Sequence, residues 1–170
     1  ASKVTRRVQR FVKSKELNLV YVPIGSLLEQ TADLMEFELK QKHCQLTIHG
    51  LEQPWPEVHV DVAMVQHVII NIVRNSMDAL MEFTPPYKHI DIAITQHSEY
   101  LICLAIKDTG PGVPKEIIGN IFEPFFTTKK QGVGIGLNIC RTTIESMGGH
   151  IWAKPKEEGG GFYITLPIMT

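Results

Sequence analysis

The most informative part of the chain reads D-T-G-P-G-V at 108–113, F-E-P-F-F-T-T-K at 122–129 and G-V-G-I-G-L at 132–137. Glycine adopts positive φ values, and it lets the backbone approach a ligand closely because it has no Cβ. The glycines of the third segment come just before a helical pattern of apolar residues, where free backbone amides bind anions. The segment between the two glycine clusters is long for a loop in a compact domain. Together these features indicate a phosphate-binding site with a lid.

The composition is that of one globular domain. The chain has 170 residues, of which 44% are hydrophobic and 21% charged, enough for a single core. A net charge of −1 gives no electrostatic reason to expect nucleic acid or an acidic membrane as a partner. No apolar run approaches the length of a membrane span, and residues 1–10 are too charged for a signal peptide. Cys44, Cys103 and Cys140 are widely spaced, which favours reduced thiols in the core of a cytoplasmic protein.

Hydrophobic periodicity predicts the order of the elements. Helices are expected at 23–42, at 61–82 after an N-cap at Asp61, at 114–122, and from the third glycine segment to Met147. Extended or strand segments are expected at 19–22, 45–49, 58–60, 89–97, 100–107, 150–154 and 161–166. Asp108 then stands at the carboxyl end of a central strand.

The helix at 61–82 carries a second functional signal. Asn71, Asn75 and Asp78 lie at i, i+4 and i+7, which places them on one face of an otherwise apolar helix. An asparagine that is buried without a partner is costly, so these amides need one. Two interpretations are open: hydrogen bonds to neighbouring backbone, or an oxygen ligand for Mg²⁺, which takes few protein oxygens together with phosphates and waters.

The four segments, N-I-V-R-N-S-M-D-A-L at 71–80 and the three quoted above, resemble in order the N, G1, F and G2 boxes of the sensor histidine kinase catalytic domain. That domain belongs to the ATPase superfamily that also contains DNA gyrase, Hsp90 and MutL. The resemblance spans about 22–167. It implies an α+β fold, a two-layer α/β sandwich of the Bergerat type, with a mixed sheet of about five strands, helices on one face, and ATP with Mg²⁺ held between the helices and a lid.

The resemblance also implies roles at the base of the nucleotide. Asp108 matches the acid that accepts a hydrogen bond from the exocyclic amine of adenine. A carboxylate accepts but never donates, so it favours adenine over guanine at that edge. Gly110 and Gly112 match the glycines that let the turn lie against the base.

At the phosphates, Asn75 matches the catalytic asparagine that binds Mg²⁺, and Asn71 is a candidate to support it. The backbone amides of Gly132, Gly134, Gly136 and Leu137 match those that hold the phosphates. In the lid, Lys129 is expected to act in catalysis by neutralising charge on the departing γ-phosphate. Thr127 and Thr128 are candidates either for capping or for contacting phosphate.

Two further features of the matched boxes leave alternatives open. Phe122, Phe125 and Phe126 are expected to anchor the lid in the core rather than to stack on adenine. Many family members carry a lysine or arginine where this chain has Asp78. A carboxylate there cannot neutralise phosphate directly, so Asp78 is expected either to hold water on the metal or to bind a neighbouring side chain.

The resemblance favours phosphate transfer over hydrolysis. Gyrase-like and Hsp90-like relatives activate water with a glutamate four residues before the Mg²⁺ asparagine, whereas this chain has Asn71, which cannot take a proton. The expected function is therefore transfer of the ATP γ-phosphate to a histidine. The alternatives are an ATP-hydrolysing clamp or a nucleotide-sensing domain.

None of the seven histidines has the surroundings of the family's phosphate acceptor. We therefore expect the acceptor on a helical hairpin outside this chain, with residues 1–17 as the end of that hairpin and 18–170 as the catalytic domain. The chain by itself is then expected to be a monomer that binds ATP without phosphorylating itself. The implied partners are the hairpin and the receiver domain of a response regulator, and the parent protein is either cytoplasmic or anchored in a membrane.

Overall fold

The computed structural model describes residues 16–126 and 136–170. Its centre is a five-stranded sheet in the order β2-β4-β5-β7-β6. The strands are β2 (Gln45–His49), β4 (His89–Gln96), β5 (Leu101–Asp108), β7 (Phe162–Pro167) and β6 (His150–Ala153). β2 pairs with β4 in parallel, and the other pairs are antiparallel. The predicted mixed sheet is confirmed, and β5, which ends at Asp108, is its central strand.

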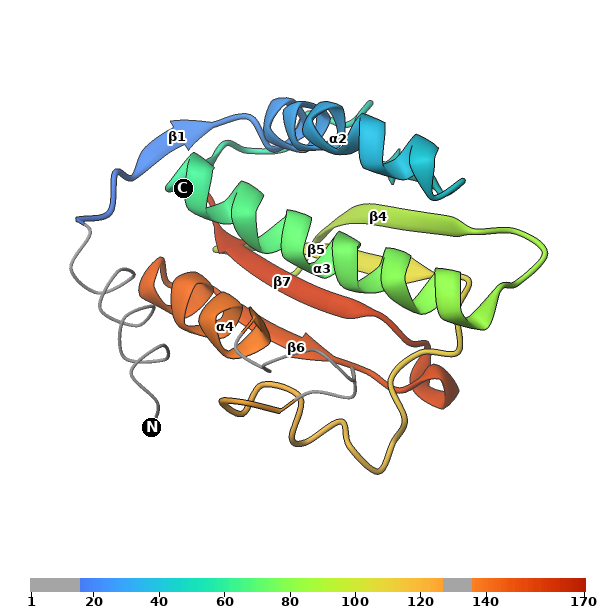
Figure 1. Cartoon of the computed structure of the whole chain (residues 1–170). Helices are drawn as coiled ribbons and strands as arrows, with labels where there is room; N and C mark the ends of the chain where they lie inside the picture. The colour runs from blue at the N-terminus through green and yellow to red at the C-terminus, as the bar shows by residue number, and fades with distance from the viewer. Residues whose placement is uncertain (1–15, 127–135) are drawn as a thin grey trace.

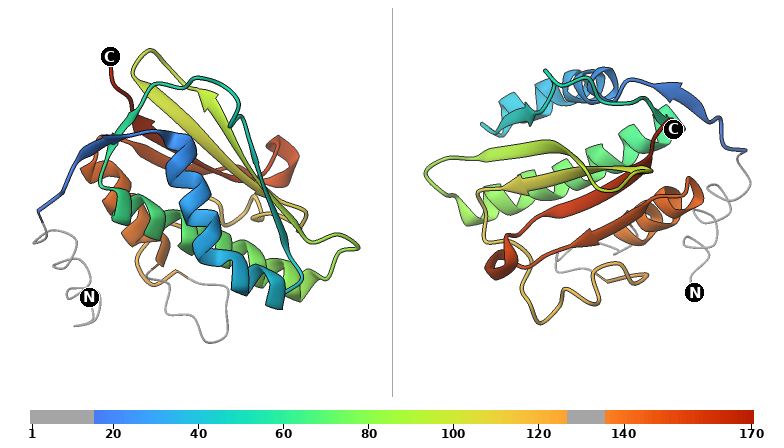
Figure 2. Two further views of the ribbon diagram at one scale, coloured as in Figure 1. Left: turned by 90° about the horizontal axis from the view of Figure 1, so that it is seen from above. Right: turned by 180° about the vertical axis from the view of Figure 1, so that it is seen from behind.

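Three helices lie on one face of this sheet: α2 (Ile24–Gln41), α3 (Val62–Phe83) and α4 (Gly136–Ser146) (Figure 1). Seen from behind, the other face carries no helix from the described residues (Figure 2). The expected two-layer sandwich is therefore correct. Pro23 occupies the cap position of α2, one residue before the helix starts.

The long helix α3 is the centre of the helical layer. It begins at the predicted cap, since the Asp61 carboxylate accepts a hydrogen bond from the Met64 amide at 3.2 Å. It also forms part of the crossover that lets β2 and β4 run parallel, because parallel neighbours cannot be joined by a tight turn. Its apolar face packs on the buried isoleucines and leucines of β4, β5 and β7. Each fully buried aliphatic side chain there stabilises the fold by about 1.5–3 kcal/mol.

A second, two-stranded sheet joins β1 (Val20–Val22) to β3 (Val58–Val60) in antiparallel register. The ring of Tyr21 stacks on that of His59 with 4.2 Å between centroids. Both strands were predicted singly, but their pairing was not, because it joins residues about forty positions apart in the chain.

The helix predicted at 114–122 is wrong. This segment forms consecutive turns in which the amides of Ile117, Asn120, Glu123 and Phe126 each donate to the carbonyl three residues earlier. Hydrogen bonds at every third residue are not a helical ladder. Gly119 weakens helix formation in the middle of the segment, and burial of Ile121 and Phe122 holds the turns on the core instead.

The C-terminal end of α4 is closed by two glycines. Gly148 has a φ of +88°. Its amide donates to the carbonyl of Glu145 at 3.0 Å, and the Gly149 amide donates to that of Ile144 at 3.0 Å, which is the hydrogen-bond pattern of a Schellman motif. β6 and β7 then form a hairpin, with a 3₁₀ turn, η1 (Lys156–Glu158), at its tip.

All three cysteines are free thiols buried in the structure, as expected. Burial raises the pKa of each thiol, and that of Cys140 reaches about 11. Among the described residues, no helix combines the length and hydrophobicity needed to cross a bilayer.

Replacing Gly149 with alanine should strongly destabilise the fold. A Cβ there would lie 2.0 Å from the carbonyl oxygen of Thr165 on β7, which is backbone and cannot easily move. We expect a loss of about 3 kcal/mol in the free energy of unfolding, measured by urea denaturation. Gly119→Ala is the control, because nothing lies within 4 Å of a Cβ at that position. Equal stability of the two variants would contradict the close packing of α4 on β7.

Candidate functional site

The turn that follows β5 is held in place from several sides. The Asp108 carboxylate oxygen Oδ1 accepts a hydrogen bond from the Gly110 amide at 2.8 Å. The Thr109 hydroxyl donates to the carbonyl of Tyr87 at 2.5 Å and accepts from the His89 amide at 3.1 Å. Asp108 is half-buried at this point. Its carboxylate is therefore fixed at the end of the central strand by its own turn and by the start of β4.

Glycine is required twice in this turn. A Cβ on Gly110 would come within 2.8 Å of Asp108 Oδ1 and 3.5 Å of Leu80 Cδ2 on α3. Gly112 has a φ of +76°, which L-residues with side chains rarely adopt. Gly110 thus leaves room for the Asp108 carboxylate, and Gly112 allows the positive φ of the turn.

At the other end of the site, α3 meets the start of α4. The Asn71 side-chain amide donates to the Cys140 sulfur at 3.2 Å. A Cβ on Gly136, the first residue of α4, would lie 2.9 Å from Asn71 Nδ2. The first amides of a helix have no acceptor within it, so backbone donors lie here beside α3. Asn71 bonds to a side chain of α4 rather than to neighbouring backbone.

The helix α3 thus links the two ends. Asn71 contacts the start of α4, and Leu80 contacts the Asp108 turn. At 1.5 Å per residue, these positions are about 13 Å apart along the helix axis. Asn75 lies between them on α3 and is half-buried. The start of α4, the Asn75 side chain and the Asp108 turn thus follow one another along α3.

Two charged residues of α3, Asp78 and Arg74, pair with residues of α2 or its C-cap. The Lys42 ammonium lies 3.4 Å from an oxygen of Asp78, which fits the expectation that Asp78 binds a neighbouring side chain. Arg74 forms a pair with Glu38 on α2, with 3.0 Å between Nε and Oε2, and so points away from the asparagines. The hydrogen bond from Arg74 lowers the pKa of Glu38, and the same bond raises the pKa of Arg74.

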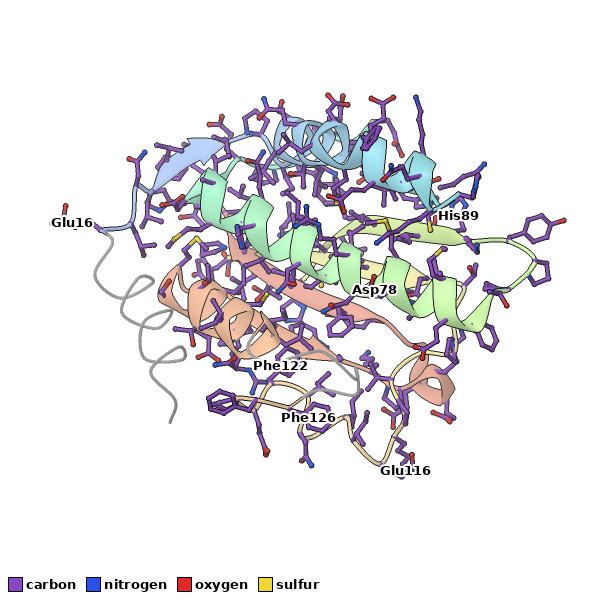
Figure 3. All side chains as sticks on the ribbon, in the orientation of Figure 1. Glu16, Asp78, His89, Glu116, Phe122 and Phe126 are labelled. Atoms are coloured by element: carbon purple, nitrogen blue, oxygen red, sulfur yellow. The ribbon has the colours of Figure 1, made fainter. Side chains whose placement is uncertain are left out.

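The phenylalanines that precede the lid divide into two kinds. Phe122 is buried, packs edge-on against Phe162 with 6.3 Å between centroids, and lies under the guanidinium of Arg141 of α4 at 4.3 Å. Phe126, labelled in Figure 3, is partly buried and packs against the hydrophobic core. Phe125 is exposed and has a φ of +66°. Anchoring in the core therefore holds for two of the three.

Several predicted ligand contacts lie outside the described residues: Thr127, Thr128, Lys129, Gly132 and Gly134. Leu137 is half-buried in the first turn of α4. Within the described part of the chain, no cluster of three or more His, Cys, Asp or Glu side chains forms a metal site. Asn75 carries a side-chain amide oxygen, a ligand type that Mg²⁺ takes together with phosphates and waters.

Comparison with protein families agrees with this geometry. Residues 60–169 match the model of the "Histidine kinase-, DNA gyrase B-, and HSP90-like ATPase" family. The chain belongs to this family. The matched range contains α3, the Asp108 turn and α4, so the whole candidate site lies in the family's catalytic domain.

The chain is similar to known sensor proteins. It is 31% identical to the sensor protein FixL of Bradyrhizobium diazoefficiens over 98% of its length and 32% identical to TdiS of Thauera aromatica over 99%. It spans only 33% and 31% of those two proteins, so about a third of each is matched.

Solved structures give the same fold. The isolated catalytic domain of histidine kinase ThkA is 26% identical, with a TM-score of 0.74, and the match covers 90% of this chain and 99% of that one. ThkA in complex with the response regulator TrrA matches with a TM-score of 0.75 at 25% identity, over 96% of this chain and 47% of that one. The chain therefore corresponds to the catalytic domain of sensor histidine kinases.

Sequence reasoning missed two residues of the site. Thr109 ties the Asp108 turn to β4, and Lys156 contacts the same turn from the distant hairpin tip. Thr109 lies inside the motif at 108–113, but only the acid and the glycines of that motif were given roles. Lys156 gives no local signal, because its contact depends on how the sheet folds.

Gly110→Ala should disturb the Asp108 carboxylate without unfolding the domain. The added methyl would displace Oδ1, which is the end of a movable side chain, so the cost to stability should be about 1–2 kcal/mol. Affinity for ATP, measured by calorimetry, should fall about tenfold or more, because the carboxylate loses its direction. Gly119→Ala serves again as the control. An unchanged affinity for Gly110→Ala would contradict this role of the glycine.

Proposed function

We propose that this chain binds ATP with Mg²⁺ along α3 and transfers the γ-phosphate to a histidine on a helical hairpin of the same parent protein. The observation that carries the proposal is a pair of contacts along α3. The turn of the half-buried Asp108 lies beside Leu80, near the C-terminal end of the helix, and the first turn of α4 lies beside Asn71, near its middle.

Each residue has the role that the family resemblance implies, and its chemistry suits that role. The Asp108 carboxylate accepts from the exocyclic amine of adenine, with Gly110 and Gly112 leaving room for the base. The amides at the start of α4, including those of Gly136 and Leu137, hold phosphate oxygens.

Nearer the transferred phosphate, the Asn75 side-chain oxygen would hold Mg²⁺, which would neutralise phosphate charge. Lys129 neutralises charge on the γ-phosphoryl group as it leaves. Gly132, Gly134, Thr127 and Thr128 complete the phosphate side of the site in this proposal.

Transfer is favoured over hydrolysis by the chemistry of the α3 face. Asn71 is an amide that donates to Cys140 and cannot accept a proton from water. Asp78, the acid on the same face, is paired with Lys42. Without a carboxylate on α3 poised to activate water, the γ-phosphate remains available to another nucleophile.

The acceptor and the downstream partner come from outside the described residues. The matched relatives are about three times as long as the chain, which leaves room for an acceptor hairpin, and residues 1–17 are proposed as its end. The ThkA kinase was solved with a response regulator, and we propose a receiver domain as the partner here too. The chain by itself would be a monomer in the cytoplasm that binds ATP and does not phosphorylate itself.

Asp108→Asn should sharply weaken ATP binding. The amide would either present a donor to the donating amine of adenine or lose its bond to the Gly110 amide. The dissociation constant measured by calorimetry should rise about ten- to a hundredfold. Asp33→Asn is the control, because Asp33 is an exposed carboxylate on α2. Equal affinities of the two variants would exclude Asp108 from adenine recognition.

The transfer reaction can be tested by mixing the chain with the purified helical hairpin of its parent and γ-labelled ATP. We expect acid-labile, base-stable label on a histidine of the hairpin and none on the chain itself. Asn75→Ala should reduce the labelling at least a hundredfold, because the oxygen ligand for Mg²⁺ is lost. Two results together would support the hydrolysing clamp instead: rapid release of inorganic phosphate by the chain alone, and no label on the hairpin in the mixture.

A further inference from the structure

Lys156 lies at the tip of the β6–β7 hairpin and reaches back to the Asp108 turn. Its ammonium donates to the carbonyl oxygen of Gly110 at 3.1 Å and lies 3.5 Å from that of Asp108. In Figure 1, the small coil of η1 lies beside the segment that follows β5. One side chain therefore bonds to both ends of the acid–glycine turn from a distant part of the chain.

The stem of the lysine also packs on this turn. A Cβ on Gly112 would meet the Lys156 Cβ at 3.3 Å and its Cδ at 3.6 Å. On the inner side, a Cβ on Gly110 would lie 3.5 Å from Leu80 Cδ2 of α3. The turn thus lies between α3 and Lys156. Gly112 has no side chain at the point where the lysine stem crosses the turn.

The hairpin holds Lys156 firmly. Gly159, Gly160 and Gly161 all have positive φ values, and the Gly160 amide donates to the carbonyl of Pro155 at 2.9 Å. A Cβ on Gly161 would come within 2.9 Å of the carbonyl oxygen of Ile106, so the hairpin lies directly on β5. The backbone from which Lys156 extends is therefore fixed relative to the strand that ends at Asp108.

An exposed lysine usually adds little, because ordering its long side chain costs entropy. Lys156 differs because it bonds to two backbone carbonyls of one turn, and the conformation of that turn sets the direction of the Asp108 carboxylate. The carboxylate of Asp108 is attached to a backbone whose carbonyl points to Lys156, and its Oδ1 is bound to the amide of Gly110, whose carbonyl also points to Lys156. Charged donors make stronger hydrogen bonds to carbonyls than neutral donors do.

We propose that Lys156 is a positioning residue for base recognition: it holds the carbonyls of Asp108 and Gly110 and so fixes the direction in which the Asp108 carboxylate meets the exocyclic amine. This inference rests on the proposed function. Lys156 acts through Asp108 and sets how well the site distinguishes adenine from a purine without that amine.

The test compares the affinities for ATP and for purine riboside triphosphate, which lacks the exocyclic amine, by calorimetry with Mg²⁺. The wild-type chain should prefer ATP by about tenfold or more. Lys156→Met keeps the stem and removes the donor, and it should reduce the preference to within about threefold while the affinity for the analogue stays unchanged. Lys156→Arg should retain most of the preference.

Two further variants separate positioning from general stability. Lys154→Met removes a lysine of the same hairpin whose ammonium lies over the Tyr163 ring at 4.9 Å, away from the turn, and it should behave as wild type. Adding Lys156→Met to Asp108→Asn should lower the preference no further, because both act through one carboxylate.

Full preference in Lys156→Met, or an equal loss of affinity for both nucleotides, would overturn the positioning role while leaving ATP binding intact. A wild-type chain that binds both nucleotides equally would overturn the adenine role of Asp108 and this inference with it. The thermal midpoint of Lys156→Met should match that of wild type, and a large drop would assign Lys156 to the fold alone.

Discussion

The packing of α3 on the central strands is the constraint on which the rest of the structure depends. Its apolar side chains, among them Ile69, Ile72 and Leu80, are fully buried against the sheet. A helix held along its length in this way cannot slide or rotate without exposing part of the core, because interiors are close-packed. Its polar face therefore presents Asn71 and Asn75 at a fixed height above the strands, and the two ends of the site keep a constant separation.

Within this frame, two glycines allow the backbone to come close to its neighbours because they have no Cβ. At Gly136 and Gly110 the backbone comes so near to α3 or to Asp108 that a methyl group would collide. The backbone at Gly136 is therefore close against α3, and the backbone at Gly110 is close against the Asp108 carboxylate. A side chain at either position would force the neighbouring group to move.

Much of the fold could be predicted because its signals are local. The alternation in β4 and β5, the helical period of α3, the cap at Asp61 and the glycines after α4 each express physics within a few residues. The segment at 114–122 misled because Ile117, Ile118, Ile121 and Phe122 have helical spacing, and a series of turns that packs them on the core shares that spacing. The motifs also pointed to Asp108 and the asparagines. The pairing of β1 with β3 and the reach of Lys156 could not be foreseen, because they arise from contacts between distant parts of the chain.

The two ends of α4 are held by different contacts. Its last turn is closed by Gly148 and pressed through Gly149 onto the carbonyl of Thr165, whereas nearer its start the sulfur of Cys140 accepts a hydrogen bond from the Asn71 side chain of α3. Cys140 and Ile144 are also buried in the core. The backbone at the start of α4 is therefore already in place beside α3, so an anion that binds there would not have to order this helix first.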